Sequence, residues 1–455
     1  MFIFLAGLAL AVLIVSNQPM LGFGLVGIAV FSLVTYYYPI TTLCLIVLLG
    51  QIIELELAPL LGMSTRGFQF GSQWVRLTDP FLAGMLITMA IRLFKEDGLA
   101  SRFMKGHGTF LILFLVYLFL EVIRNIPSFG MNAPGELRTY YLFILLVPYA
   151  TLNICSQKDR ERLFVALIVI AFSYVLWGLL RAWLIFDFHF APYEKWMSGF
   201  GSLSLLYGMF ALYFGHREKL IRLPGIVVYL FYSVGVVMII VAGTRAVWLA
   251  GFVGVVVLWV SSRTSFGKNL RQLLLIPLIL LLLIPIFQYS GLGIWEFVSS
   301  RLMAFTDFES DPTAVWRFRY WLATIDQIIQ HPWFGSGFGK DFGIYIPEFR
   351  SIETTSPHNL YLAVIYQVGI FGFAFYVAWV LSFAAQLKKR LASIGVDRAV
   401  VSLALIILVT IHAYGMAYSF ERCFLPWIFV GLAASVLFNE EPETKDIQVE
   451  EEKRP

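Results

Sequence analysis

"LFVALIVIAFSYVLWGLL", residues 163–180, contains no charged side chain and is apolar along almost its whole length. An α-helix needs about 20 such residues to cross the hydrocarbon core of a bilayer. Similar runs recur from the first residue to about residue 438, in a chain that is 59% hydrophobic and 14% charged with a mean hydropathy of +0.79. The sequence therefore predicts a polytopic integral membrane protein whose spans pack as one helical unit. The first apolar stretch lacks a basic n-region and a small-residue cleavage site, so we expect a span there and not a removable signal.

The charged loops divide the chain into about fourteen apolar segments. We therefore expect an all-α fold with about 12–14 transmembrane helices. The segments lie near residues 2–16, 20–37, 40–57, 79–95, 109–125, 139–155, 163–183, 199–215, 225–243, 245–261, 273–288, 358–385, 400–416 and 424–438.

Alternate loops carry clusters of lysine and arginine, for example Lys158 to Arg162 and Lys388 to Arg390. By the positive-inside rule these loops are cytoplasmic, which places both termini inside. The predicted organisation is a transmembrane bundle over residues 1–288, an outer loop over 289–356, C-terminal transmembrane helices over 357–438 and a disordered, mostly acidic cytoplasmic tail over 439–455.

The outer loop contains a predicted helix of its own. Asp311 and Pro312 have the character of an N-cap followed by a first-turn proline, and Pro332 stops the run. One face of this helix carries apolar residues at helical spacing, namely Val315, Phe318, Leu322, Ile325 and Ile329. This pattern predicts a short amphipathic helix on the membrane surface.

Four arginines are expected on the outer side of the protein. Arg245, in "VAGTRAVWLAG", separates two closely joined apolar runs, Arg138 starts another span, and Arg317 and Arg319 belong to the loop helix. Guanidinium groups match phosphate oxygens and stay charged at all pH values, so the group favours a diphosphate clamp. The alternative interpretation is that each arginine is an interface anchor whose head reaches water.

Ser356-Pro357-His358-Asn359 precedes the span at 358–385 and is predicted as an N-cap, a proline and two residues of the first helical turn. His358 would then lie at the positive end of a helix, where the dipole disfavours the imidazolium. A neutral imidazole can act as a general base near pH 7. The alternative interpretation is a capping or interface histidine.

Several other functions are not supported by the sequence. No His, Cys, Asp or Glu cluster has the spacing of metal ligands, and the net charge of +4 is spread over many loops, which gives no support to nucleic-acid binding. The glycine-rich segment from Gly335 to Gly339 follows no predicted strand and opens no helix, so we expect a flexible turn and not a nucleotide loop.

Three motifs carry a resemblance to a known family. His358-Asn359, nine residues, then Gly369-Ile-Phe-Gly372 resembles the signature of the bacterial O-antigen ligases, shared loosely with the Wzy-type O-antigen polymerases. "RFRYWLATIDQIIQHPWFGSGFG", residues 317–339, is similar to the arginine, tryptophan, HP and GxG block of that family. "GTRAVWLAG", residues 243–251, resembles its SRG-like segment, with threonine in place of serine and alanine in place of glycine.

The resemblance implies a metal-independent, cofactor-free, inverting glycosyltransferase of the GT-C type in the bacterial inner membrane, with its site on the periplasmic face. The donor would be a glycan on undecaprenyl diphosphate. The acceptor would be lipid A–core in a ligase, or a second lipid-linked repeat in a polymerase. His358 matches the catalytic histidine of the family, and Arg245 and Arg317 match its diphosphate-binding arginines.

Some assignments rest on placement and some alternatives stay open. Arg138 and Arg319 join the predicted diphosphate-binding residues through their placement, and Asn359, the second residue of the His-Asn pair, is predicted as a catalytic residue with His358. Ligase and polymerase both fit the motifs, and the spacing of the glycine pair favours the ligase. A membrane transporter or flippase would also have many spans, but the charges gather at one face instead of mid-membrane.

Overall fold

The structure is a computed structural model in which eleven longer ranges and three single residues are described. These are residues 19–57, 68–70, 73–76, 78–104, 108–186, 197–261, 299, 303, 311–340, 342–346, 349, 351–353, 356–418 and 423–438. The predicted segments at 2–16 and 273–288 and the tail at 439–455 lie outside these residues.

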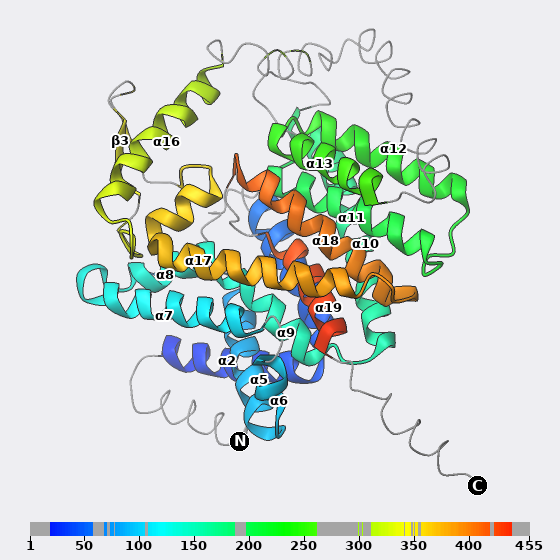
Figure 1. The fold of residues 1–455 in the computed structure, drawn as a ribbon, viewed down its shortest axis with the longest axis horizontal. Helices are drawn as coiled ribbons and strands as arrows, with labels where there is room; N and C mark the ends of the chain where they lie inside the picture. Colours follow the sequence, from blue (N-terminus) through cyan, green and yellow to red (C-terminus); the bar gives the residue numbers. More distant parts are fainter. Residues whose placement is uncertain are drawn as a thin grey trace.

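Helices make up nearly all of the described chain, which confirms the all-α class (Figure 1). They are α2 (Pro19–Tyr37), α3 (Pro39–Val47), η1 (Leu48–Leu57), α5 (Asp79–Lys95), α6 (Leu99–Phe103), α7 (Thr109–Phe129), α8 (Asn132–Tyr140), η3 (Leu142–Leu145), α9 (Leu146–Asn153), α10 (Gln157–Phe186), α11 (Gly199–Arg217), α12 (Gly225–Val241), α13 (Arg245–Ser261), α16 (Pro312–Gln330), α17 (Leu360–Lys389), α18 (Gly395–Gly415) and α19 (Phe424–Phe438). Two short antiparallel hairpins accompany them, β1 (Phe68–Phe70) with β2 (Gln73–Val75) and β3 (Ile344–Ile346) with β4 (Ser351–Glu353).

Four of the described helices, α7, α10, α17 and α18, are long and apolar enough to cross a membrane. A fifth span is possible by the same criteria if α2 and α3 are taken together, although they bend by 118° where Tyr38 meets Pro39. The segments predicted at 20–37 and 40–57 therefore form one bent pair, either a broken span or a re-entrant loop. Other predicted spans, at 139–155, 225–243, 245–261 and 424–438, correspond to shorter apolar helices.

The centre of the bundle is made by α9, α18 and α19, and α19 is buried along almost its whole length. Trp427 of α19 stacks on Trp379 of α17 and on Phe143, with ring centroids 5.6 Å apart in both pairs. These large aromatic contacts fix α17 against the core. The helix that follows the candidate histidine therefore has a rigid support.

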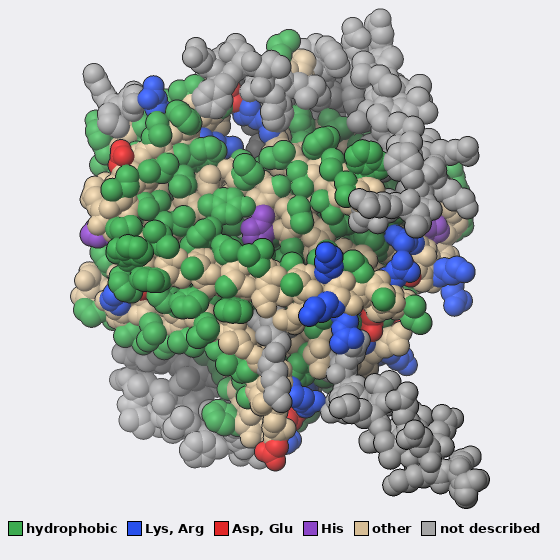
Figure 2. All heavy atoms as spheres, viewed as in Figure 1, with side chains coloured by type: hydrophobic (Ala, Val, Ile, Leu, Met, Phe, Trp, Pro, Cys, Tyr) green, Lys and Arg blue, Asp and Glu red, His purple; other side chains and the backbone are tan. Residues whose placement is uncertain are grey.

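One end of the bundle gathers the basic loops. Arg160 at the start of α10 forms a two-pronged ion pair with Asp397 at the start of α18, with N–O distances of 2.8 and 3.2 Å. Arg398 and Arg217 both approach Glu218. Figure 2 shows hydrophobic side chains over most of the visible face, with lysine and arginine gathered toward its right-hand end. The loops predicted to share the cytoplasmic side are thus neighbours, while their orientation in a membrane stays a prediction.

Helix α16 begins as the sequence predicts. The Asp311 side chain accepts a hydrogen bond from the Thr313 amide (3.0 Å), and Pro312 occupies the first turn. The buried face, however, is the one that carries Trp316, Tyr320 and Thr324, which packs against β3 and α17. The predicted apolar face is largely exposed, through Phe318, Leu322, Ile325 and Ile329. This exposed stripe fits a helix on a membrane surface.

The segment after α16 is fitted into a break in α17. Gly369 lies at φ 67°, ψ −173°, outside the helical region, and its neighbour Ile370 donates its amide to the Pro332 carbonyl (2.8 Å). Gly337 donates in turn to the Gln367 carbonyl (3.0 Å). The glycine-rich segment is therefore not the flexible turn that the sequence predicts, because its backbone replaces hydrogen bonds that α17 loses at the break.

A buried side-chain network also holds this break. Gln367 donates to Glu136 of α8 (2.7 Å) and accepts from the Tyr141 hydroxyl (2.7 Å), while Glu136 also accepts from the Gly339 amide. Helix α8, the loop segment and α17 are thereby joined at one place. The network fixes the direction in which the N-terminal part of α17 projects.

Candidate active site

His358 lies just before α17 and not inside its first turn. The N-cap is Asn359, whose side-chain oxygen accepts the Leu362 amide (3.1 Å) and whose amide nitrogen donates to the Met416 carbonyl (3.2 Å). The prediction that Ser356 caps the helix is therefore wrong. The imidazole comes from the residue before the cap, outside the first helical turn on which the predicted effect of the helix dipole depends.

The backbone of His358 is in the left-handed region, with φ 49°. Such a conformation is uncommon for a residue with a side chain and costs energy that the surrounding structure must supply. The support is visible on the N-terminal side, where the Trp321 indole nitrogen of α16 donates to the Pro357 carbonyl (2.7 Å). Helices α16 and α18 thus hold the turn from both sides.

Aromatic rings surround the half-buried imidazole of His358. The ring centroid of Trp316 is 5.8 Å away, and that of Tyr418, just past the end of α18, is 5.5 Å away in an edge-on arrangement. The Arg317 guanidinium carbon lies 5.0 Å from the centroid of the same Tyr418 ring. His358 and Arg317 therefore share one aromatic neighbour, the Tyr418 ring.

Arg245 is joined to the same group through an ion pair. It is the first residue of α13, and its guanidinium lies 2.5 Å from a carboxylate oxygen of Asp311, the N-cap of the helix that carries Arg317. Partial burial alone would raise the pKa of the Asp311 carboxyl. The hydrogen bond and charge of Arg245, with the amides of Thr313 and Ala314, outweigh burial and hold that pKa below its usual value.

Buried contacts around Gly199 also link the neighbourhood of Arg245 to Tyr418. A Cβ atom built on Gly199, at the start of α11, would lie 3.2 Å from a methyl carbon of Thr244 and 3.5 Å from the Tyr414 hydroxyl. Tyr414 stacks on Tyr418 with centroids 5.1 Å apart. The neighbour of Arg245 is thus linked to the aromatic residue that touches both His358 and Arg317.

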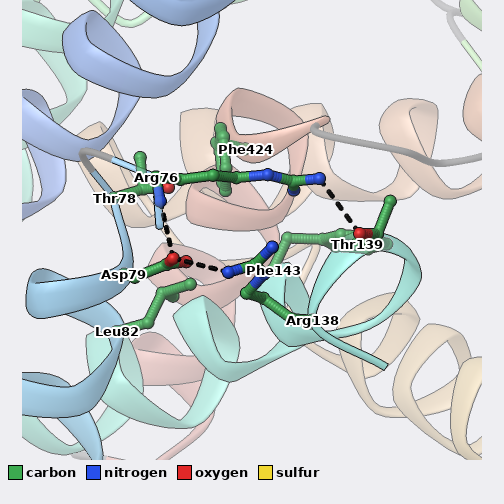
Figure 3. Close-up of a pocket in the computed structure, with 8 residues that line it drawn as sticks. All are labelled: Arg76, Thr78, Asp79, Leu82, Arg138, Thr139, Phe143 and Phe424. Carbon is green, nitrogen blue, oxygen red and sulfur yellow. Dashed lines mark hydrogen bonds and ion pairs between the residues drawn. The ribbon is translucent and has the colours of Figure 1, made fainter. Parts of the chain in front are cut away.

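Arg138 and Arg319 lie elsewhere. Arg138 pairs with Asp79 at the start of α5 (2.7 Å), and it lines a pocket beside Arg76, which donates to Thr139 (3.0 Å) (Figure 3). Its charge therefore helps to join α5 to α8. Arg319 projects from the exposed side of α16. Of the predicted site residues, the structure brings together His358, Asn359, Arg317 and Arg245.

The sequence interpretation missed Tyr418, Trp316 and Asp311 as members of the site. Trp316 precedes Arg317 and could have been noticed in "WRFRYW", while Asp311 was recognised only as a helix cap. Tyr418 follows α18 without any motif, so no local signal indicates it. Within the described part of the chain, no group of three His, Cys, Asp or Glu side chains is placed to hold a metal ion.

The fold defines the class of the protein, a polytopic helical membrane protein, and the contacts group a histidine and two arginines as its candidate site. The comparison with known families agrees, because residues 225–377 match the family model described as O-antigen ligase. This match supports the assignment of the protein to the O-antigen ligase and Wzy-type family, which points to a glycosyltransferase-like enzyme. The matched residues include Arg245, Arg317 and His358 but neither Arg138 nor Tyr418. No curated protein matches the chain.

Proposed function

We propose that the protein transfers a glycan from undecaprenyl diphosphate to a sugar hydroxyl of lipid A–core, on the periplasmic face of the inner membrane. The observation that carries this proposal is the shared contact of His358 and Arg317 with the Tyr418 ring. A base for the acceptor and a cation for the leaving group would thereby both lie against one aromatic ring.

The reaction needs one proton transfer and one displacement. The His358 imidazole takes the proton of the acceptor hydroxyl as the oxygen attacks the anomeric carbon of the donor sugar. The bond from that carbon to the diphosphate oxygen breaks, and undecaprenyl diphosphate leaves with the electron pair. Attack from the face opposite the leaving group inverts the anomeric configuration. Fixed guanidinium groups stabilise the charge that develops on the diphosphate.

Arg317 is the better placed of the two arginines to receive the diphosphate. Its Nε atom is buried and makes no hydrogen bond to the described part of the chain, whereas Arg245 is already paired with Asp311. We infer that Arg317 binds the diphosphate directly. Arg245 would hold the N-terminus of α16 and share its remaining N–H groups with the donor, because a guanidinium has five.

The lipid chain of the donor gives a reason for the exposed face of α16. Phe318, Leu322 and Ile329 are exposed beside Arg317, so a helix that lies in the membrane interface would place the guanidinium at phosphate depth. The start of α17 carries His358, and its end carries Lys388 and Lys389. The positive-inside rule then places His358 on the periplasmic side.

The decisive experiment uses the purified full-length protein in nanodiscs with a glycan on undecaprenyl diphosphate as donor. Lipid A–core and a second lipid-linked repeat are offered in separate reactions. We expect extension of lipid A–core, loss of transfer in His358→Ala, and normal transfer in His331→Ala, whose exposed side chain provides a matched control. Extension of the lipid-linked repeat alone would identify a polymerase. Movement of the donor across the bilayer without transfer to either acceptor would identify a flippase.

A further inference from the structure

Two buried hydroxyl groups meet at the start of α11, next to the candidate site. Ser198 caps this helix, accepting the Gly201 amide (3.0 Å), and the following residue, Gly199, faces both groups. A Cβ built on Gly199 would be 3.5 Å from the Tyr414 hydroxyl and 3.6 Å from the Thr244 hydroxyl. The hydroxyls therefore come from two separate elements, the end of α18 and the turn before α13, and converge on one position.

Neither hydroxyl makes a hydrogen bond to any part of the chain that the structure describes. Thr244 is 1% exposed and Tyr414 is 0% exposed, so bulk water does not satisfy them. Buried polar groups in folded proteins almost always have a partner, because losing hydration without replacement destabilises the folded state. Two such groups at one place indicate a site for a further group with hydrogen-bond acceptors.

Cationic groups lie around the same position. Thr244 directly precedes Arg245, and Tyr414 stacks on Tyr418, over which the Arg317 guanidinium lies. The Nε atom of Arg317 is also buried without a hydrogen bond among the described residues. The residues that carry the two hydroxyls thus adjoin Arg245 in the sequence and Tyr418, the ring beneath Arg317, in space. A ligand that offers several acceptor oxygens and negative charge suits hydroxyl and guanidinium donors alike.

We infer that the Tyr414 and Thr244 hydroxyls form a subsite for phosphate oxygens of the donor diphosphate, a role that rests on the proposed function. Each hydroxyl would donate one hydrogen bond to an oxygen that is not bonded to Arg317. A Cβ at Gly199 would lie 3.2 Å from a methyl carbon of Thr244, so a residue without a side chain lets this turn approach the two hydroxyls closely.

The test separates binding from folding. Tyr414→Phe and Thr244→Val remove only the hydroxyls, and because these groups lack partners in the free protein, its thermal stability should be unchanged or higher. Affinity for undecaprenyl diphosphate, measured with the full-length protein in nanodiscs, should weaken about tenfold or more in each variant, as expected for a hydrogen bond to a charged group. Tyr376→Phe is the matched control, because the Tyr376 hydroxyl has a partner, the His412 ring nitrogen at 3.0 Å. That variant should lose stability and keep its affinity.

Arg317→Ala provides the reference for the proposed function itself. If Arg317→Ala weakens binding and both hydroxyl variants bind undecaprenyl diphosphate like the wild type, the subsite is refuted while the donor site stands. If Arg317→Ala binds normally, the donor site itself is refuted. A loss of stability in Tyr414→Phe equal to that in Tyr376→Phe would also refute the subsite, because the hydroxyl would then have a structural partner.

Discussion

Replacing Gly369 with alanine tests whether the break in α17 positions the site. A Cβ at this residue would lie 2.2 Å from the Trp333 carbonyl oxygen, 2.3 Å from its carbon and 2.5 Å from the Phe334 amide nitrogen. All three atoms belong to the backbone, so the rotation of a side chain cannot relieve the clash. The inserted segment would have to move, and the hydrogen bonds from Ile370 and Phe371 to the Pro332 and Trp333 carbonyls would lengthen.

The expected loss of folding stability in Gly369→Ala has two parts. At φ 67°, ψ −173° Gly369 occupies a region that essentially only glycine adopts, so a residue with a side chain there costs about 1–3 kcal/mol, and overpacking in a closely packed interior costs about 1–3 kcal/mol. We therefore expect Gly369→Ala to lower the free energy of unfolding by about 2–6 kcal/mol. Gly27→Ala in α2 is the control, because a Cβ there has no atom within 4 Å.

The same substitution should reduce turnover in the protein that remains folded. Gly369 lies within α17, the helix that follows His358. It approaches the segment that follows α16, the helix that carries Arg317. A shift between these two helices would separate the base from the cation. Stability is measured by thermal unfolding in nanodiscs, and turnover by glycan transfer at a temperature where the variant is folded. If Gly369→Ala had the stability and the turnover of the wild type, the close approach of Trp333 and Phe334 would not be the reason for glycine at this position.

Further expectations concern the site and its orientation. His358→Ala should reduce the rate of glycan transfer by a factor of ~10²–10⁴ and leave donor affinity nearly unchanged, because a general base acts on the acceptor. Equal losses of transfer rate and donor affinity would instead indicate a binding role. Arg317→Ala should weaken donor binding about ten- to a hundredfold in a direct binding assay, with partial recovery in Arg317→Lys, which keeps the charge but loses the fork. Because Arg245 lowers the pKa of Asp311, the stabilisation from this ion pair should be complete above an ordinary aspartate pKa of about 3.9 and be lost as the pH falls through the lower pKa of the folded state. Acid titrations of the wild type and Asp311→Asn should therefore begin to converge as the pH falls below about 4 and should meet only below the folded-state pKa, and parallel curves would contradict the pair. A cysteine in place of Ile329 should react with an impermeant thiol reagent from outside, and one in place of Lys389 should not; the reverse pattern would place the candidate site in the cytoplasm.

The helices could be predicted from the sequence because each depends on its own composition. Apolar runs of the required length indicated α7, α10, α17 and α18, and an aspartate followed by proline indicated the start of α16. The bend between α2 and α3 was visible only as Pro39, which does not specify an angle. Whether such a pair crosses the membrane or turns back depends on what it packs against.

The start of α17 shows where local patterns become insufficient. Both Ser356 and Asn359 are good N-cap residues, and the sequence interpretation selected the first. The structure selects Asn359, whose side chain also reaches the Met416 carbonyl, while Trp321 holds the preceding turn. The choice depends on contacts with residues far away in the sequence, and it places His358 in a strained turn instead of a helix.

The sequence by itself determined the all-α class, the helical character of the loop segment after Asp311 and the identity of the histidine and the two arginines that the structure groups. Those features rest on short-range chemistry, namely hydrophobic length, cap residues and motif spacing. Only the tertiary structure decided that Trp316, Tyr320 and Thr324 form the buried face of α16, because in a membrane an apolar face can be covered by lipid as well as by protein. It also decided that Arg138 pairs with Asp79 and that Tyr418 contacts both His358 and Arg317. The physical reason is that a guanidinium or an aromatic ring can find a partner in many places, and which one it meets depends on how the whole bundle packs.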